Sequence, residues 1–220
     1  MEILRPAQIE RRSMDIIAGE LSERGIVLPE ETKDVVMRVI HATADFDYAE
    51  NLHFTDGAAS RGAQALAGGA TVVSDTNMAR AGISRAGLEK LGGKAICYMA
   101  DPEVARSAKE RGVTRATVSF ETAAREHPGA VCAVGNAPTA LYEIVRQMEL
   151  GFRPTLVIAV PVGFVNVVEA KQALWESCAA HGVPAIAAMG RKGGSTVAAA
   201  VVNALIYRAA GMQDPEKRGW

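Results

Sequence analysis

The chain of 220 residues has few aromatic side chains, no excess of charge of one sign and no long apolar run. Aromatic residues make up 5% of the chain, and the formal net charge is −1. A protein that binds nucleic acid without sequence preference normally carries a basic excess, which argues against that class. No segment approaches the roughly 20 apolar residues that a membrane-spanning helix needs, and the N-terminus has no apolar signal region. These absences predict a soluble cytoplasmic protein that binds neither nucleic acid nor membrane.

Cysteine and nucleotide-binding motifs are also scarce. The three cysteines, Cys97, Cys132 and Cys178, are widely spaced and form no CxxC pair. Two of them lie in predicted strands, so the sequence predicts buried free thiols in a reducing compartment. The chain has no GxGxxG fingerprint, and the segment GRKGGST (190–196) lacks the GK[ST] ending of a phosphate-binding loop.

What the chain does contain is an alternation of short apolar runs with helical patterns. Leu156–Val160 is an uninterrupted apolar run, which is typical of a strand buried on both faces. Pro161 and Gly163 end it, because proline cannot donate to a ladder and glycine permits a tight turn. The predicted strands are Thr71–Ser74, Ala95–Met99, Ala130–Val134, Thr155–Val160 and Ala185–Met189. They predict a three-layer α/β fold with a mostly parallel five-stranded sheet and helices on both faces.

Helical spacing and capping residues place helices between these strands. Those with the clearest start or stop signals run from Pro6 to Gly25, from Pro29 to His41, from Gly57 to Ala67, from Thr114 to Glu126, and from Thr196 to Arg208. The polar tail 211–220 is predicted to be frayed. The chain shows no internal repeat and no linker, so residues 1–220 are predicted to form a single domain.

Three strand ends, after Val134, Val160 and Met189, carry glycines and lead into helices. Backbone N–H groups at such helix starts bind anions. The candidate ligand-binding residues at these turns are Asn136, Thr139, Gly163, Lys171, Arg191, Gly193, Gly194 and Ser195. Sites spread over several turns suit a ligand with several carboxylates better than a single pyrophosphate.

Two basic positions and a histidine complete the candidates. Arg115 lies in the first turn of a predicted helix, where the dipole disfavours a cation by roughly 0.3–1 kcal/mol, so it would gain from a nearby anion. Arg12 and Ser13 belong, with Arg11, to a polar cluster at the start of a predicted helix, and such a cluster is more often a solvated helix turn than a binding site. His41 follows Ile40 and borders apolar surface; a lone histidine there is more often structural than catalytic. A metal site of His41 with Asp45 and Asp47 is an alternative, weakened by the lack of a second histidine.

Five segments of the chain resemble the precorrin-8X methylmutase family and its cobalt-precorrin-8 counterpart. They are IERRSM (Ile9–Met14), RVIHATADFD (Arg38–Asp47), GNAPTAL (Gly135–Leu141), PVGFVNVVEAK (Pro161–Lys171) and GRKGGST (Gly190–Thr196). The resemblance covers roughly residues 5–208 in consistent order. Met14 departs from it, since phenylalanine is expected at that position, and the tail lies outside it.

The resemblance implies an isomerase of corrin (cobalamin) biosynthesis that moves a methyl group from C-11 to C-12 of the macrocycle. It implies a flavodoxin-like fold, a homodimer with the substrate near the subunit interface, and no separate cofactor, cobalt being present only within the substrate. His41 is implied as the catalytic general acid, and Ser13 and Arg115 as substrate contacts. The carboxylate arms of a tetrapyrrole would suit Arg12, Arg115, Arg191 and Lys192.

Two other functions stay open at this point. A corrinoid carrier would bind the product and hand it to the next enzyme without converting the substrate, and an enzyme of the family can combine both roles. A nucleotide-binding module of flavodoxin type is the other alternative, which the missing fingerprints disfavour.

Overall fold

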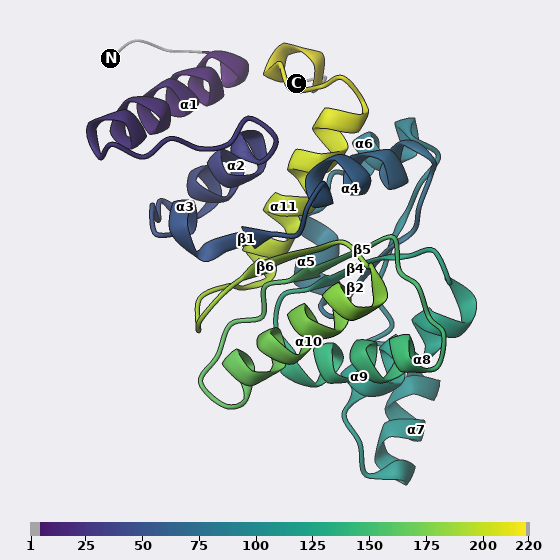
Figure 1. The fold of residues 1–220 in the computed structure, drawn as a ribbon. Helices are drawn as coiled ribbons and strands as arrows, with labels where there is room; N and C mark the ends of the chain where they lie inside the picture. Colours follow the sequence, from purple (N-terminus) through teal and green to yellow (C-terminus); the bar gives the residue numbers. More distant parts are fainter. Residues whose placement is uncertain (1–4, 219–220) are drawn as a thin grey trace.

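A mostly parallel sheet of six strands forms the centre of the computed structural model, which describes residues 5–218 (Figure 1). The strands are β1 (Leu52–Phe54), β2 (Val72–Ser74), β3 (Ala95–Ile96), β4 (Val131–Val134), β5 (Leu156–Ala159) and β6 (Ala185–Ala188). Their order across the sheet is β1-β6-β5-β4-β2-β3, and only β1 runs antiparallel to its neighbour. The prediction of a mostly parallel sheet is confirmed, whereas the prediction of five strands is wrong.

The missed strand β1 is short and lies at one edge of the sheet. Leu52 pairs with Ala188 and Phe54 with Ile186 of β6. Leu52 is buried, but His53 is exposed and Phe54 is half-buried. Three residues with such mixed exposure show neither a continuous apolar run nor a sustained alternation, so the sequence pattern gave no strand signal.

Helices pack on both faces of the sheet. In the described range they are α1 (Pro6–Glu23), α2 (Lys33–Thr43), α3 (Tyr48–Asn51), α4 (Ala58–Ala67), α5 (Asn77–Gly82), α6 (Arg85–Lys90), α7 (Pro102–Arg111), α8 (Arg115–Glu126), α9 (Pro138–Glu149), α10 (Val167–His181), α11 (Ser195–Ala209) and the 3₁₀ helix η1 (Pro215–Arg218). One face carries α2, α4, α5, α6 and α11, and the other carries α8, α9 and α10 (Figure 1). The predicted three layers are therefore confirmed. Among the described residues, no helix has both the length and the apolar character to cross a membrane.

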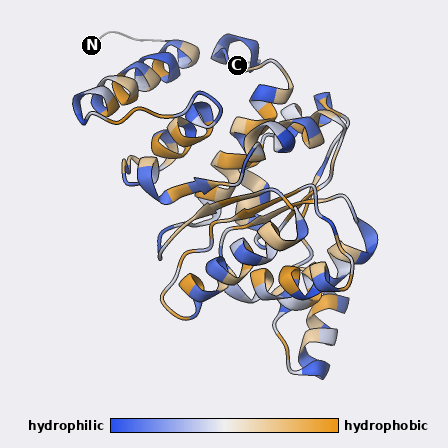
Figure 2. Cartoon of the chain, viewed as in Figure 1, coloured by the Kyte–Doolittle hydropathy of each residue, from blue (hydrophilic) through white to orange (hydrophobic). Residues whose placement is uncertain are grey.

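The core lies on both sides of the sheet because successive strand residues point to opposite faces. Ile158 and Ile186 pack toward α11, while Val157 and Ala187 pack toward α9. All four side chains are buried, and the strands are among the most hydrophobic parts of the ribbon (Figure 2). This burial on both faces explains why the strands appear in the sequence as uninterrupted apolar runs.

Some sequence-based boundaries and burials need correction. Helix α2 begins at Lys33 instead of Pro29, because residues 29–32 form a turn in which Thr32 N–H donates to the Pro29 carbonyl. Strand β3 ends at Ile96 rather than at residue 99. Cys132 and Cys178 are buried free thiols as predicted, but Cys97 lies beyond the end of β3 and is half-buried.

The described part of the C-terminal tail is ordered against the body, so the prediction that it is frayed is wrong for residues 211–218. Met212 is buried, and η1 brings Arg218 onto α1 and α11. The Arg218 guanidinium pairs with Glu10 and lies 3.9 Å from the centre of the Tyr207 ring. Residues 219 and 220 lie outside the described residues.

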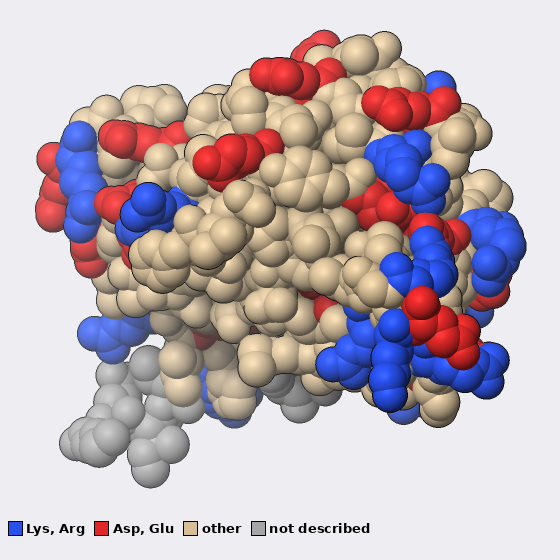
Figure 3. Space-filling view, turned by 90° about the horizontal axis from the view of Figure 1, so that it is seen from below, with Lys and Arg blue, Asp and Glu red and all other residues tan. Residues whose placement is uncertain are grey.

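Charges of both signs share the surface. On the face seen from below, Lys and Arg side chains lie beside Asp and Glu side chains at both the left and the right margins, and the centre of the face shows few charges (Figure 3). This mixture agrees with the near-neutral net charge of the chain.

Candidate functional site

His41 lies in the last turn of α2 and lines a cavity of about 370 Å³ between α2, α5 and α11. Ser195 and Thr196, the first residues of α11, line the same cavity. The remaining lining residues are Arg38, Ala42, Met78, Gly82, Ala199, Ala200, Asn203 and Tyr207. The structure thus brings the predicted catalytic histidine and a predicted substrate-binding serine to one cavity, although they are far apart in the sequence.

The surroundings of His41 disfavour its charged form. Partial burial lowers the pKa of His41 below its ordinary value of 6.5, and the guanidinium of Arg38, one turn earlier on α2, lowers it further. Glu10 opposes this shift and Arg218 adds to it. In the ligand-free protein at neutral pH, His41 is therefore mostly a neutral imidazole.

Asp45 and Asp47, which follow α2, are held by the lysine of the β6–α11 loop. Lys192 Nζ lies 2.7 Å from an Asp45 carboxylate oxygen and 2.6 Å from one of Asp47. The two hydrogen-bonded carboxylates raise the pKa of Lys192. Within residues 5–218, no group of three or more His, Cys, Asp or Glu side chains is placed to hold a metal ion. The alternative of a metal site at His41, Asp45 and Asp47 is therefore not supported, and the ammonium group of Lys192 neutralises the two carboxylates instead.

The β5–α10 and β6–α11 turns are joined through their backbones. Gly194 N–H donates to the Val160 carbonyl at 2.8 Å, and Gly163 N–H donates to the Arg191 carbonyl at 3.2 Å. A Cβ atom on Gly193 would lie 2.1 Å from the Val160 carbonyl oxygen, so only glycine fits there. These three predicted site glycines therefore set the shape of the two turns.

Lys171 was predicted to contact the ligand, but the structure buries it completely. Its Nζ donates to the carbonyl oxygens of Gly190 at 2.9 Å and Lys192 at 2.8 Å. Burial lowers the pKa of Lys171 to about 8. Lys171 therefore supports the β6–α11 loop from inside, and it does not reach a ligand directly.

The start of α11 offers free hydrogen-bond donors. In the described part of the chain, the backbone N–H groups of Ser195, Thr196 and Val197 have no hydrogen-bond partner. The Ser195 hydroxyl shares a hydrogen bond of 2.7 Å with the hydroxyl of Thr76, which follows β2. This helix start therefore retains the anion-binding capacity predicted for it.

The start of α9 differs, because its anion site is already filled. The buried carboxylate of Asp75 accepts the backbone N–H groups of Gly135, Asn136 and Ala137 at 2.8, 2.7 and 2.7 Å. Burial raises the pKa of Asp75, while these three hydrogen bonds oppose the shift. The prediction of a free anion site at this turn is wrong. An aspartate directly after a buried strand was the signal that could have revealed it.

The side chains of the α9 turn lie near the α7–α8 connection. Asn136 is exposed, and the Thr139 hydroxyl shares a hydrogen bond of 2.9 Å with the hydroxyl of Thr114, which caps α8. Arg115 is exposed and donates to the Met99 carbonyl at 3.1 Å. The structure thus places Asn136, Thr139 and Arg115 along the carboxyl-end edge of the sheet.

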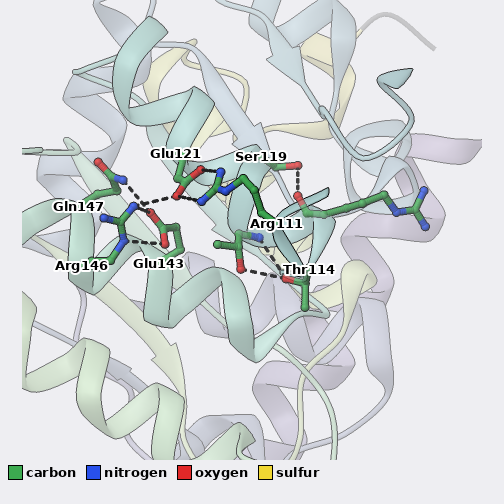
Figure 4. Close-up of polar contacts among 9 residues, drawn as sticks. Arg111, Thr114, Ser119, Glu121, Glu143, Arg146 and Gln147 are labelled. Carbon is green, nitrogen blue, oxygen red and sulfur yellow. Dashed lines mark hydrogen bonds and ion pairs between the residues drawn. The ribbon is translucent and has the colours of Figure 1, made fainter. Parts of the chain in front are cut away.

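An ion-pair network holds the α7–α8 pair that carries Arg115. Glu121 of α8 accepts from Arg111 of α7 and from Arg146 of α9, and Glu143 accepts from Arg146 (Figure 4). The Ser119 hydroxyl donates to the Arg115 carbonyl at 2.7 Å. These contacts fix α8 on α9 and so fix the position from which Arg115 projects.

Two predicted substrate contacts lie on α1, away from the cavity. Arg12 is exposed, and the half-buried Ser13 hydroxyl donates to the Ile9 carbonyl of its own helix at 2.9 Å. Neither side chain lines the His41 cavity. Within one copy of the chain, the structure does not bring these two residues to the site.

Comparison with known proteins then decides the family. A family model described as precorrin-8X methylmutase matches residues 8–208, a range that includes every candidate site residue. The chain belongs to the precorrin-8X methylmutase family. It is accordingly an isomerase of cobalamin biosynthesis.

Individual members of the precorrin-8X methylmutase family cover nearly the whole chain. The cobalt-precorrin-8 methylmutase of Salmonella typhimurium is 41% identical over 212 residues, which are 93% of this chain and 96% of that protein. The precorrin-8X methylmutase of Pseudomonas aeruginosa is 37% identical over 207 residues, with 93% and 97% covered. A crystal structure of a precorrin-8X methylmutase from Thermus thermophilus gives a TM-score of 0.83 at 39% identity, with 92% and 98% covered.

Proposed function

We propose that this methylmutase moves a methyl group from C-11 to C-12 of precorrin-8X or cobalt-precorrin-8, giving hydrogenobyrinate or cobyrinate, with His41 as the general acid. The observation that carries the proposal is the cavity that His41 shares with the first residues of α11. A proton donor and a set of free anion-binding amides thereby meet in one place. Similar relatives are named for both substrates, so the substrate itself is left to the experiment below.

The rearrangement breaks the bond from the methyl carbon to C-11 and forms a bond from the same carbon to C-12. His41 would lend a proton to a ring nitrogen, raise the electrophilicity of C-12 and recover the proton afterwards. General acid catalysis of this kind contributes roughly 10²–10⁴ in rate. Because the methyl group stays on the substrate, we propose that no separate cofactor takes part and that cobalt enters only within the substrate.

The ligand's own carboxylates would supply the negative charge that stabilises a protonated His41. In the free protein, partial burial and the nearby Arg38 guanidinium hold the pKa of His41 low. A carboxylate arm bound at the free amides of Ser195, Thr196 and Val197 would favour the protonated imidazole in the complex. Binding would thus convert His41 to its acid form at the time when the acid is required.

The macrocycle itself requires an apolar surface with cations around it. Phe164 and Val165, in the β5–α10 turn, are among the most exposed large apolar side chains of the described residues. The Arg191 guanidinium lies 5.5 Å from the centre of the Phe164 ring. We propose that this turn contacts the flat face of the pigment, while Arg191, Arg115 and Asn136 contact its carboxylate arms.

A second copy of the chain would complete the site. Ile9 and Ile16 lie seven residues apart on α1 and remain 52% and 54% exposed, an apolar stripe that a partner could cover. Arg12 and Ser13 lie between them on the same helix. We propose a homodimer in which α1 brings Arg12 and Ser13 toward the cavity of the other protomer.

The order of the five parallel strands supports a flavodoxin-like architecture. Counted without β1, the strands follow the order 2-1-3-4-5, with the topological switch point between β2 and β4. A nucleotide-binding module would bind its phosphates at that point. Asp75 already occupies the amides there, so this observation favours the methylmutase over the nucleotide-binding alternative.

The visible absorption spectrum tests the proposal. Purified protein is incubated with precorrin-8X and, separately, with cobalt-precorrin-8, and conversion to the corrin spectrum is followed. We expect His41→Ala to abolish turnover while corrin binding is largely retained. His53→Ala is the matched control, since His53 is also exposed but lies on the edge strand β1. Wild-type turnover by His41→Ala would remove His41 from the mechanism, and tight product binding without any conversion would favour the carrier.

A further inference from the structure

The carboxylate of Asp75 differs from the other buried carboxylates of the described residues. Glu10 and Glu143 are each paired with arginine guanidinium groups. Within residues 5–218, Asp75 has no salt-bridge partner, and three backbone N–H groups of residues 135–137 satisfy its two oxygens. Its side chain is completely buried, so these bonds are sheltered from water.

Asp75 also lies at a special place in the fold. It directly follows β2, and the amides that it binds directly follow β4, its neighbour in the sheet. The connections from these two strands leave in opposite directions, which makes the crevice between them the usual ligand site of such sheets. Here the protein fills the crevice with its own carboxylate, so this helix start is used for internal support.

The same short segment supports a second helix start. The Ser74 hydroxyl donates to the Thr76 carbonyl at 2.9 Å, and the Thr76 hydroxyl shares a hydrogen bond with that of Ser195, the first residue of α11. Gly135 packs closely against α11, since a Cβ there would lie 2.9 Å from Ser195 Cα. The starts of α9 and α11 are therefore held at a fixed separation by residues 74–76.

We infer that Asp75 is a positioning residue for substrate binding: its carboxylate holds the 135–137 turn so that Asn136 and Thr139 face the pigment. The inference rests on the proposed function. No rotamer of an asparagine at position 75 could accept all three N–H groups, because one of its two terminal atoms is itself a donor. The turn would relax, and Asn136 and Thr139 would lose the position from which they contact the pigment, which weakens binding more than it slows the chemical step.

Asp75→Ala and Asp75→Asn test the inference together with added formate. Asp75→Ala leaves room for one carboxylate beside three N–H groups, and formate has the size and charge to occupy it. We expect the KM for the tetrapyrrole and the Kd for hydrogenobyrinate to rise at least tenfold in Asp75→Ala, with a smaller change in kcat. Formate should recover most of the lost affinity, while chloride at equal ionic strength should not. Asp75→Asn keeps the side-chain volume and should show the rise in KM without formate rescue.

Asp34→Asn is the matched control, because Asp34 is a half-buried carboxylate that also accepts a backbone N–H group, that of Val35, and lies at the start of α2, outside the site. It should lower thermal stability but leave KM and Kd within twofold of the wild type, with no response to formate. Wild-type KM and Kd in both folded Asp75 variants would overturn the inference, and so would an equal rise in KM in Asp34→Asn. Failure of the wild type itself to convert or bind the pigment would instead overturn the proposed function.

Discussion

Arg38 is the neighbour that most directly sets the charge of His41. Its guanidinium is held by the Glu10 carboxylate at 2.5 Å and lies 5.3 Å from the centre of the Tyr207 ring. Both partners restrict its motion, so the positive charge stays beside the imidazole. In the proposed mechanism this charge keeps His41 unprotonated until a ligand brings negative charge to the cavity.

The pH dependence of kcat/KM should therefore show a low pKa, because this parameter reports the free enzyme. The pKa of His41 lies below its ordinary value of 6.5. The protonated fraction of His41 therefore falls as the pH rises through this lowered pKa. We expect kcat/KM to fall about tenfold per pH unit above the midpoint. Arg38→Met removes the nearby cation and should move the midpoint to higher pH.

Arg11→Met is the control for this measurement, because Arg11 is an exposed residue of α1 that pairs with Asp214. Its pH profile should match that of the wild type. An unchanged midpoint in Arg38→Met, or a rate that rises with pH over the same range, would contradict the role of His41 as an acid.

At the scale of the elements, the β6–α11 loop requires glycine at two positions, Gly190 and Gly193, for different physical reasons. Gly190 has a φ of +74°, and a Cβ there would meet nothing within 4 Å. A Cβ on Gly193 would instead meet the Val160 carbonyl at 2.1 Å, which is backbone and cannot move aside alone. Glycine is thus required at position 190 by the left-handed backbone conformation. At position 193 it is required because two turns approach each other closely.

Gly193→Ala should consequently cost more than Gly190→Ala. We expect Gly193→Ala to lower the free energy of unfolding by about 3 kcal/mol and to raise the KM, since the loop must move away from β5. Gly190→Ala should cost about 1–2 kcal/mol, the penalty of a left-handed conformation alone. Denaturant unfolding with parallel kinetics would measure both, and equal effects of the two variants would argue against the close contact.

The sequence predicted the elements with uninterrupted patterns and missed contacts made across the fold. The parallel strands are apolar on both faces and bounded by glycine or proline, so the sequence could place them. The edge strand β1 has one buried residue in three and carries no such pattern. The role of Lys171 was equally hidden, because its partners are carbonyl groups about twenty positions later that any residue could supply.

For the candidate site, the sequence supplied the residue types but not which of them meet. His41 and Ser195 share a cavity because α2 packs on α11, a pairing that local patterns do not encode. In the sequence, Asp75 is only a polar residue that follows a predicted strand. Its three amide partners become apparent only when the order of β2 and β4 in the sheet is known.

At the scale of the whole molecule, the two ends of the chain are joined through Glu10. The side chain of Arg218 is only 5% exposed in its pair with Glu10, whereas Arg11 is 51% exposed in its pair with Asp214. Buried charged partners lose more than exposed ones when a pair is broken. The family match ends at residue 208, so this contact of the tail is additional to it.

Arg218→Ala should lower the free energy of unfolding by about 1–3 kcal/mol, because Glu10 keeps only one of its two guanidinium partners. Arg11→Ala, on the same surface, should change it by less than about 1 kcal/mol. Urea unfolding followed by circular dichroism would compare the two. Equal urea midpoints for Arg218→Ala and the wild type would mean that the tail contributes nothing to the free energy of unfolding.

The proposed dimer predicts that activity depends on association of two chains, because Arg12 and Ser13 do not line the His41 cavity of their own chain. A stable interface buries about 1,200–2,000 Å² in total, and the apolar stripe of α1 would belong to it. The double variant Ile9→Glu and Ile16→Glu should be a monomer by sedimentation velocity. Its turnover should be lost although His41 is intact. Val27→Glu, at an exposed position outside α1, should leave both unchanged.

Mixing two inactive variants separates a shared site from a merely adjacent one. If each site takes His41 from one protomer and Arg12 and Ser13 from the other, a heterodimer of His41→Ala with the double variant Arg12→Ala and Ser13→Ala contains one intact site and one doubly damaged site. After subunit exchange, half of the dimers are mixed, so activity should return to about a quarter of the wild-type value. If all contacts came from one chain, both sites of the heterodimer would be damaged and mixing would restore nothing.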